Sequence, residues 1–235
     1  MAKRKHDTFN LNIEFVAGMS TYSATATKSW IASEVALAEK LYRDAPRLKI
    51  KWWVRRQTRA GGKTLANMAF KNKVQYRTFM DKHMDNVVGT DKTKGCLRVL
   101  LVNSVTVKDS TGILGMAFFP HCVTPFRRKY GVLVVNKSWP MVLAHELGHV
   151  FGLKHTFEAY VGLKLNCNKG YKKGETGKGD SRKSSGAYNI MDYPPGDPGT
   201  KVYLNDCQKK RSGSQRYTYM TAKGETNYRR LKGLV

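Results

Sequence analysis

The chain has 235 residues, and its hydrophobic fraction of 41% is typical of a globular protein and argues against disorder throughout. No run of 18 or more apolar residues is present, so we expect no membrane-spanning helix. Lys and Arg number 42 against 17 Asp and Glu. The resulting net charge of +25 attracts polyanions such as nucleic acid or acidic proteins, although a solvated basic surface without a specific partner is the simpler explanation.

The first ten residues bear on the compartment. They are basic, but no apolar segment follows them, so the sequence as written carries no secretory signal. The protein stays where it is made, leaves by another route, or is a mature domain that begins with a new methionine. The compartment is left open, with secretion or export slightly favoured.

Two strands and a helix are predicted in the first quarter of the chain. Residues 9–17 and 48–55 alternate apolar and polar side chains, which predicts a strand in each segment. Between them, residues 24–43 place apolar side chains at near-helical spacing. Pro46 stops this helix, which is expected to bury one face.

Further elements follow along the middle of the chain. A basic stretch after the two glycines at 61–62 is predicted to become helical from about residue 73 to residue 86. Three apolar runs then predict buried strands. They span residues 96–107, 113–120 and 131–136. Pro140 stands where a helix begins, and this helix is predicted to run to Gly152.

The composition changes after residue 155. Residues 168–186 are rich in glycine, lysine and serine, and residues 194–200 read PPGDPGT, so both segments are predicted to be loops. A last helix is predicted within residues 214–231. The order of elements predicts an α+β fold, or an α/β layer, built on one mixed twisted sheet.

Residues 145–155 read HELGHVFGLKH and carry the chemistry. His145 and His149 are four residues apart, so on a helix they share one face and both imidazoles can reach one ion. Glu146 can then hydrogen-bond a water on that ion without being a ligand. Gly152 allows the chain to turn through a left-handed conformation, so that His155 supplies the third nitrogen. Three histidines leave one zinc position open for water, as a catalytic site requires.

This pattern resembles the signature of the metzincin zinc peptidases, whose fold has a backing helix, an active-site helix and a loop-rich C-terminal lobe. Residues 1–155 would form the lobe that ends in the zinc-binding helix, and 156–235 the second lobe of one catalytic domain. Metzincins also have a downstream methionine turn, and NIMDY at 189–193 matches it. The resemblance implies that Met191 lies under the metal, whereas an ordinary core methionine is the alternative.

Within the metzincins, the chain most resembles the pappalysins. Three segments carry this resemblance: LGMAFFP at 114–120, HTF at 155–157 and the NIMDY segment. Pappalysins bind calcium through carboxylates between the third histidine and the methionine turn. Here residues 168–186 offer only Glu175 and Asp180 among lysines, which argues against a calcium site.

The resemblance also implies how substrate would bind. Gly115, Met116 and Ala117 would form the upper rim of the cleft and hold an extended peptide as an added strand. Tyr193 would donate its hydroxyl to the oxyanion, or else is a tyrosine packed in the turn. Asp197 would lie at the base of the pocket for the residue after the scissile bond and select Arg or Lys, unless it only forms a turn.

The four cysteines are few, and composition alone leaves two disulfides or four free thiols open. In the predicted fold, Cys96 opens one strand and Cys122 closes the next, whereas Cys167 and Cys207 bracket the loops around the methionine turn. We predict the disulfides Cys96–Cys122 and Cys167–Cys207 for an oxidising compartment.

The sequence therefore predicts a zinc-dependent endopeptidase that hydrolyses peptide bonds through a metal-bound water. Glu146 acts as general base and then as general acid. Two alternatives stay open. One is a nucleic-acid-associated metalloprotease, and the other is an exported toxin-type protease or a binding module whose metal helix is structural. In each, the basic surface would serve for docking.

Overall fold

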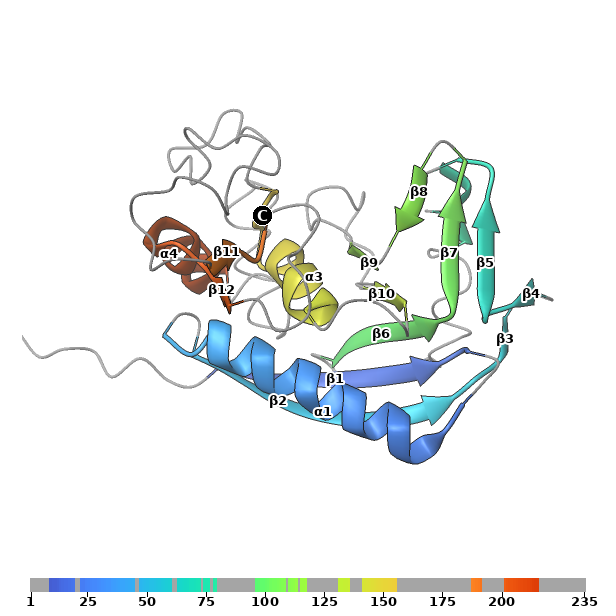
Figure 1. Cartoon of the computed structure of the whole chain (residues 1–235), viewed down its shortest axis with the longest axis horizontal. Coiled ribbons are helices and arrows are strands. Elements are labelled where there is room, and N and C mark those ends of the chain that lie inside the picture. The colour runs from blue at the N-terminus through green and yellow to red at the C-terminus, as the bar shows by residue number, and fades with distance from the viewer. Residues whose placement is uncertain are drawn as a thin grey trace, which may run out of the picture.

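A computed structural model of the chain describes thirteen segments: residues 9–19, 22–44, 47–60, 63–72, 74–76, 78–79, 96–108, 110–113, 115–117, 131–135, 141–155, 187–191 and 201–215. Its centre is a five-stranded sheet with the strand order β2-β1-β6-β10-β9 (Figure 1). The strands are β1 (Phe9–Ala17), β2 (Leu48–Arg56), β6 (Cys96–Val102), β9 (Gly115–Ala117) and β10 (Gly131–Val135).

The sheet is mixed, as the sequence predicted. Strands β2, β1, β6 and β10 are parallel neighbours, whereas the short edge strand β9 runs antiparallel to β10. Alternation explains why β1 is a strand, because Leu11, Ile13 and Phe15 all point to one face and are fully buried there. The predicted α+β fold with a mixed sheet is confirmed.

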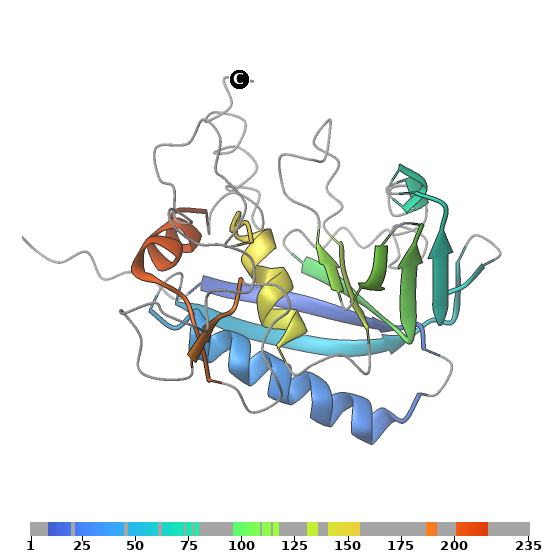
Figure 2. The same ribbon diagram turned by 45° about the horizontal axis from the view of Figure 1, so that its top comes forward.

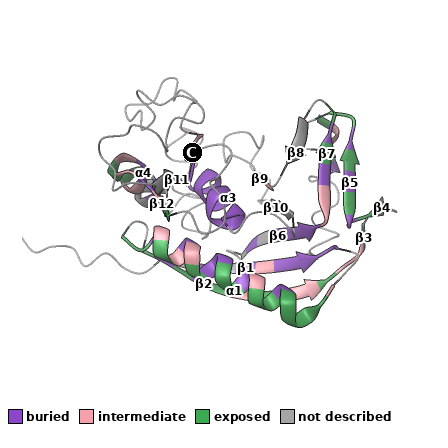
Figure 3. Ribbon diagram, viewed as in Figure 1, coloured by how far each residue is buried: buried purple, intermediate pink, exposed green. Residues whose placement is uncertain are grey.

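Two helices pack on the same face of this sheet. The backing helix α1 (Ala24–Leu41) runs alongside β1 and β2, and α3 (Val142–Val150) lies against α1 and β9 (Figures 1 and 2). Ser23 caps the start of α1 by accepting a hydrogen bond from the Ala26 amide. Every residue of α3 is buried, which the colouring of Figure 3 shows along its whole length. This explains its uniformly apolar sequence apart from the motif residues.

A smaller sheet stands beside the first and covers part of its opposite face (Figure 1). It contains β5 (Asn67–Phe70), β7 (Ser104–Val107) and β8 (Ser110–Ile113), and a short hairpin of β3 (Arg59–Ala60) and β4 (Lys63–Thr64) precedes it. The single strand predicted over 96–107 is therefore wrong. The chain breaks at Asn103, whose amide donates to the Ala66 carbonyl at 2.7 Å, and β7 leaves for the second sheet.

Other predictions need smaller corrections. The run at 113–120 was predicted as one strand, but residue 113 ends β8 and residues 115–117 belong to β9, whereas 114 and 118–120 lie outside the described residues. Residues 74–76 and 78–79 are helical, and the rest of the helix predicted over 73–86 lies outside the described residues.

The C-terminal part contains three elements that the sequence did not predict. They are β11 (Ala187–Asn189), β12 (Lys201–Tyr203) and α4 (Asp206–Gln215). Residues 216–235 lie outside the described residues, so the helix predicted within 214–231 stays a prediction, as do the loops predicted at 168–186 and 194–200. Among the described residues, no helix is long and apolar enough to span a membrane.

Candidate metal centre

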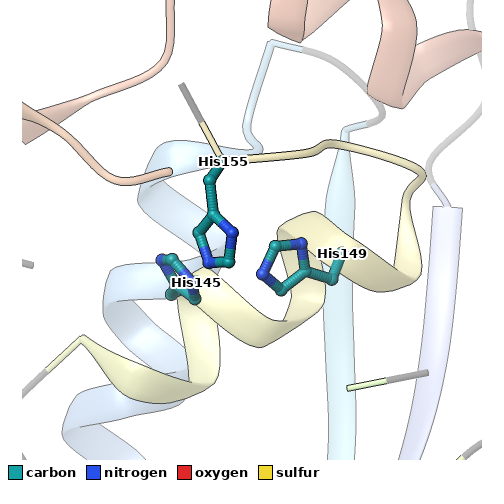
Figure 4. A group of neighbouring side chains, drawn as sticks. All are labelled: His145, His149 and His155. Atoms are coloured by element: carbon teal, nitrogen blue, oxygen red, sulfur yellow. The ribbon is translucent and has the colours of Figure 1, made fainter. Parts of the chain in front are cut away.

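Three histidines from one short stretch of chain converge beside the C-terminal half of α3. His145 and His149 lie one turn apart on α3, and His155 follows six residues later (Figure 4). One nitrogen from each ring can be chosen so that all three lie within 4.8 Å of one another. The ring centroids are 4.6 to 5.3 Å apart. The predicted three-histidine cluster is therefore present.

A glycine turn carries the chain from α3 back to the cluster. Gly152 has a φ of 78°, which is the left-handed conformation that the sequence predicted at this position. The Leu153 amide donates to the Gly148 carbonyl at 2.8 Å and the Gly152 amide to the His149 carbonyl at 2.9 Å. These two bonds form a Schellman motif, which ends the helix and satisfies its last carbonyls.

Backbone carbonyls orient two of the rings. The Nδ1 atom of His145 lies 2.6 Å from the Ile190 carbonyl oxygen, and that of His149 lies 2.8 Å from the Leu153 carbonyl oxygen. A carbonyl can only accept, so each Nδ1 carries the hydrogen and each Nε2 presents a lone pair. Burial, and then the neighbouring rings of His145 and His155, hold the pKa of His149 well below its ordinary value. Neutral imidazoles with a free Nε2 are the form that binds a metal.

Glu146 is buried and follows His145 directly on α3. Its Oε2 atom has no hydrogen-bond partner among the described residues. Burial raises the pKa of Glu146 to about 8, whereas a hydrogen bond from the Ala117 amide lowers it. A buried carboxylate oxygen without a partner is costly, and a metal ion with its water is the kind of group that would satisfy it. The three nitrogens and this oxygen together fit a metal.

Met191 packs directly against the back of α3. Its side chain is fully buried, and a Cβ atom on Gly148 would collide with its Sδ atom. Gly148 therefore lets Met191 approach the helix between the two histidines. The structure thus brings Met191 against the helix that carries His145 and His149, whereas its place beneath a metal stays a prediction.

Residues 25–156 match the reprolysin-like metallo-peptidase family M12B, which is 132 of the 235 residues. The chain belongs to this family. The family model supports the predicted metallopeptidase assignment, and the three-histidine site is of the kind that could hold the metal of such a peptidase. The match does not single out the pappalysins, which stay a resemblance of short segments. Comparison with curated proteins gave no match.

Comparison with solved structures gave matches that include two of low sequence identity. Metalloproteinase-II from Bacteroides fragilis has a TM-score of 0.51 at 16% identity, over 88% of this chain and 54% of that one. This chain therefore spans about half the length of that protein, and the likeness concerns the fold alone. Archaemetzincin from Methanopyrus kandleri has a TM-score of 0.41 at 14% identity, over 90% of this chain and 97% of that one.

In this metallopeptidase, the backing helix holds the active-site helix through two buried polar contacts that sequence reasoning missed. An oxygen of Glu34 accepts the Leu143 amide at 2.9 Å, and the Tyr42 hydroxyl donates to the Ala144 carbonyl at 2.9 Å. Burial raises the pKa of Glu34 to about 7, and the Leu143 amide lowers it. One signal could have identified Glu34, because it stands on the apolar face of α1 among residues that the helical period predicts to be buried.

Tyr76 is a second residue that the sequence analysis missed. It is buried in the helical segment 74–76, with its ring packed edge-on against Phe70 at 5.2 Å. Burial, and then the charge of Glu146, raise the pKa of Tyr76 well above its ordinary value. The phenol is therefore protonated, and it lies close enough to Glu146 for the two groups to interact. Nothing in the local sequence signals this proximity.

The remaining predicted site residues divide into two groups. Gly115, Met116 and Ala117 form β9 beside Glu146, and a Cβ atom on Gly115 would lie 2.6 Å from the Glu146 Oε1 atom. The second group lies outside the described residues: Tyr193, Asp197, Glu175 and Asp180. Cys207 is disulfide-bonded, but the side chains of the other cysteines are not among those described, so both predicted pairings stay predictions.

Proposed function

We propose that this metallopeptidase is a zinc-dependent endopeptidase with His145, His149 and His155 as the metal ligands. The main support for this proposal is the convergence of three buried or half-buried imidazoles beside a buried carboxylate. Backbone carbonyls orient two of these imidazoles. Three protein ligands with an open position are typical of catalytic rather than structural zinc. When bound, zinc supplies Lewis acidity that polarises the scissile carbonyl and acidifies a water.

Glu146 would handle the protons of the reaction. Its carboxylate takes a proton from the attacking water and passes it to the leaving amine, so one group serves as base and then as acid. A pKa raised by burial favours the second step, because the protonated form is accessible near neutral pH. A nearby dication would favour the ionised form needed for the first step. The Ala117 amide holds the carboxylate in place between these steps.

Substrate would bind along β9 at the edge of the sheet. Among the described residues this strand pairs only with β10, and an extended peptide can add to such an edge. In this proposal Gly115, Met116 and Ala117 form the rim of a cleft between the lobes 1–155 and 156–235 of one catalytic domain. Met191 belongs to a methionine turn beneath the metal, as its contact with Gly148 supports.

Two further roles rest on the pappalysin resemblance. Tyr193 would donate its hydroxyl to the oxyanion that forms during hydrolysis. Asp197 would lie at the base of the pocket that receives the residue after the scissile bond, and would select Arg or Lys there.

The test of this function combines metal content with a conservative substitution. Protein purified without added metal should contain one zinc per chain by elemental analysis. Glu146→Gln should retain the zinc but lower kcat by about 10²- to 10⁴-fold on a peptide substrate, since the amide cannot accept the proton of water. Glu39→Gln on α1 is the matched control and should retain full activity. Absence of zinc, with no activity after zinc addition, or full activity in Glu146→Gln, would overturn the assignment.

A second candidate function places the peptidase on a polyanion, either as a nucleic-acid-associated protease or as an exported toxin-type protease. The observation that favours docking is the edge strand β2, where Lys51 and Arg56 are exposed and Trp53 keeps 42% of its surface exposed. Basic side chains around an aromatic ring suit nucleic acid. Duplex DNA should then bind with an affinity that falls steeply with salt, and Lys51→Glu should weaken it. Absence of binding at low salt would leave a simple solvated surface.

A further inference from the structure

We propose that Gln208 on α4 is a positioning residue for His145, acting through Asn189 and the turn at residues 189–191. The inference rests on the proposed role of His145 as a metal ligand. It concerns side chains outside residues 145–155 that follow the five-stranded sheet in the sequence.

Asn189 and Gln208 form a reciprocal pair of carboxamides in the protein interior. Both side chains are fully buried. The Asn189 Nδ2 atom donates to the Gln208 Oε1 atom at 2.8 Å, and the Gln208 Nε2 atom donates back to the Asn189 Oδ1 atom at 3.2 Å. A buried amide group needs a partner for both its donor and its acceptor, and each of these residues supplies both for the other.

Gln208 is itself fixed at the beginning of α4. The Asn205 Oδ1 atom accepts the Gln208 amide at 2.8 Å, and the Gln208 Oε1 atom accepts the Asn205 amide at 3.0 Å. Since α4 begins at Asp206, Asn205 caps the helix and Gln208 is its third residue, which is the arrangement of a capping box. The helix end therefore holds the Gln208 side chain in one place, ready to bind Asn189.

Asn189 transmits this constraint to the turn next to His145. Its Oδ1 atom also accepts the Met191 amide at 3.0 Å, which closes a tight turn around Ile190. The Ile190 amide donates to the Tyr203 carbonyl at 3.0 Å. With both flanks of the peptide fixed, the Ile190 carbonyl lies 2.6 Å from the His145 Nδ1 atom.

That carbonyl decides the tautomer and the direction of the His145 ring. With the hydrogen on Nδ1, the Nε2 lone pair faces the other two histidines. A metal ligand whose orienting partner is lost typically loses 10- to 100-fold in metal affinity. The contacts therefore run from the start of α4 to a single ring nitrogen, across 63 residues of sequence between His145 and Gln208. Gln208 acts on the metal without touching it.

Replacing Gln208 with glutamate tests the pair, because glutamate has almost the same shape as glutamine but lacks the Nε2 donor. The variant loses the hydrogen bond to Asn189 and gains a buried charge. The zinc dissociation constant, measured by competition with a chelator, should rise about 10- to 100-fold. The ¹⁵N signals of the His145 imidazole in the metal-free protein should show loss of the single Nδ1–H tautomer. Val107→Ala, in the second hydrophobic cluster, is the control for lost stability and should leave the zinc dissociation constant unchanged within about twofold.

The design separates three outcomes. His145→Ala must weaken zinc binding strongly; if it does not, the proposed function fails together with the inference. If His145→Ala weakens zinc binding but Gln208→Glu binds zinc as tightly as Val107→Ala, the inference alone is overturned. This comparison requires the two variants to have equal melting temperatures. Should Gln208→Glu not fold, Gln208→Met adds no buried charge and carries the same expectation.

Discussion

Opposing influences act on the pKa of the buried Glu146 side chain. Burial raises its pKa to about 8, whereas the Ala117 amide lowers it, and a dication at the neighbouring histidines would lower it further. Together these influences bring the pKa of Glu146 near neutral pH, where one carboxyl group can act first as a base and then as an acid. Its neighbour His145 is constrained differently, because a carbonyl oxygen decides which ring nitrogen carries the hydrogen. Two adjacent residues on one helix thus receive their chemistry from different segments of the chain.

Substrate preference should depend on a single residue, Asp197. An acid at the floor of a pocket with little water is costly unless a cation fills it, so cleavage before Arg or Lys is expected. Profiling a peptide library with the wild type and with Asp197→Ala would measure this, and the variant should lose the basic preference with its zinc content intact. Asp206→Ala, which removes an exposed acid, is the matched control. Cleavage before large apolar residues, unchanged in Asp197→Ala, would show that Asp197 only forms a turn.

At the scale of elements, α3 depends on α1 for the cap that its own sequence lacks. The residue before α3 is Met141, whose side chain makes no capping bond, and the first turn of α3 contains no acidic residue. Glu34 instead accepts the Leu143 amide from the neighbouring helix and so satisfies one of the amides at the start of α3. Tyr42 holds the following turn through the Ala144 carbonyl. The active-site helix is therefore positioned by its packing partner.

Glu34 also makes stability depend on pH in a direction that can be predicted. Its folded-state pKa of about 7 exceeds the ordinary value of 4.5, so the folded protein holds this proton more tightly than the unfolded chain. The contribution of Glu34 is therefore fully present below about pH 4.5 and is lost as the pH rises through 7. Glu34→Gln retains an acceptor for the Leu143 amide but carries no charge. It should stabilise the protein at pH 8 by up to about 3 kcal/mol relative to wild type.

Urea unfolding of both proteins at several pH values between 4.5 and 8 measures this difference, and contributions common to both proteins cancel. The advantage of Glu34→Gln should shrink toward zero at the acidic end. An advantage that does not vary with pH, or a destabilised variant at pH 8, would show that the charge of Glu34 is satisfied in the folded protein.

At the scale of the whole molecule, two hydrophobic clusters lie on opposite faces of the five-stranded sheet. Leu101 faces the cluster that contains α1 and α3, whereas Leu100 faces the cluster beneath the smaller sheet. Adjacent residues of β6 point to opposite faces, so one strand supports both clusters. The metal centre lies where α3 meets β9 and the turn at 189–191. Segments far apart in the sequence therefore have to fold together before the site exists.

A disulfide should tie the C-terminal part of this assembly. Cys207 on α4 is disulfide-bonded, and we predict Cys167 as its partner. The bond would close a loop of about 40 residues and contribute about 4 kcal/mol by the chain-entropy relation. Peptide mapping of the non-reduced protein by mass spectrometry identifies the partner, and Cys167→Ser should lower the melting temperature. A peptide that links Cys207 to Cys96 or Cys122 would contradict the prediction.

The sequence by itself determined the parts of the protein that depend on local spacing. The strand at 9–17 and the helix from 24 were predicted because their apolar periods are regular. The three histidines were predicted because four residues make about one helical turn and Gly152 permits the left-handed turn. The same residues carry the resemblance to zinc peptidases, whereas the reprolysin-like family was identified only by the family model. None of these features requires knowledge of what lies across the fold.

Only the tertiary structure decided the features that join distant segments. The apolar run at 96–107 looks continuous, yet backbone bonds to Ala66 divide it between two sheets. Helix α4 has no apolar period of its own, and it is anchored where Gln208 meets Asn189. The position of Glu34 on an apolar helix face was visible in the sequence, but the hydrogen-bond partners of Glu34 and Gln208 were not, because a buried polar side chain is explained by its partner. Those partners lie 109 and 19 residues away along the chain, and packing alone brings them within hydrogen-bonding distance.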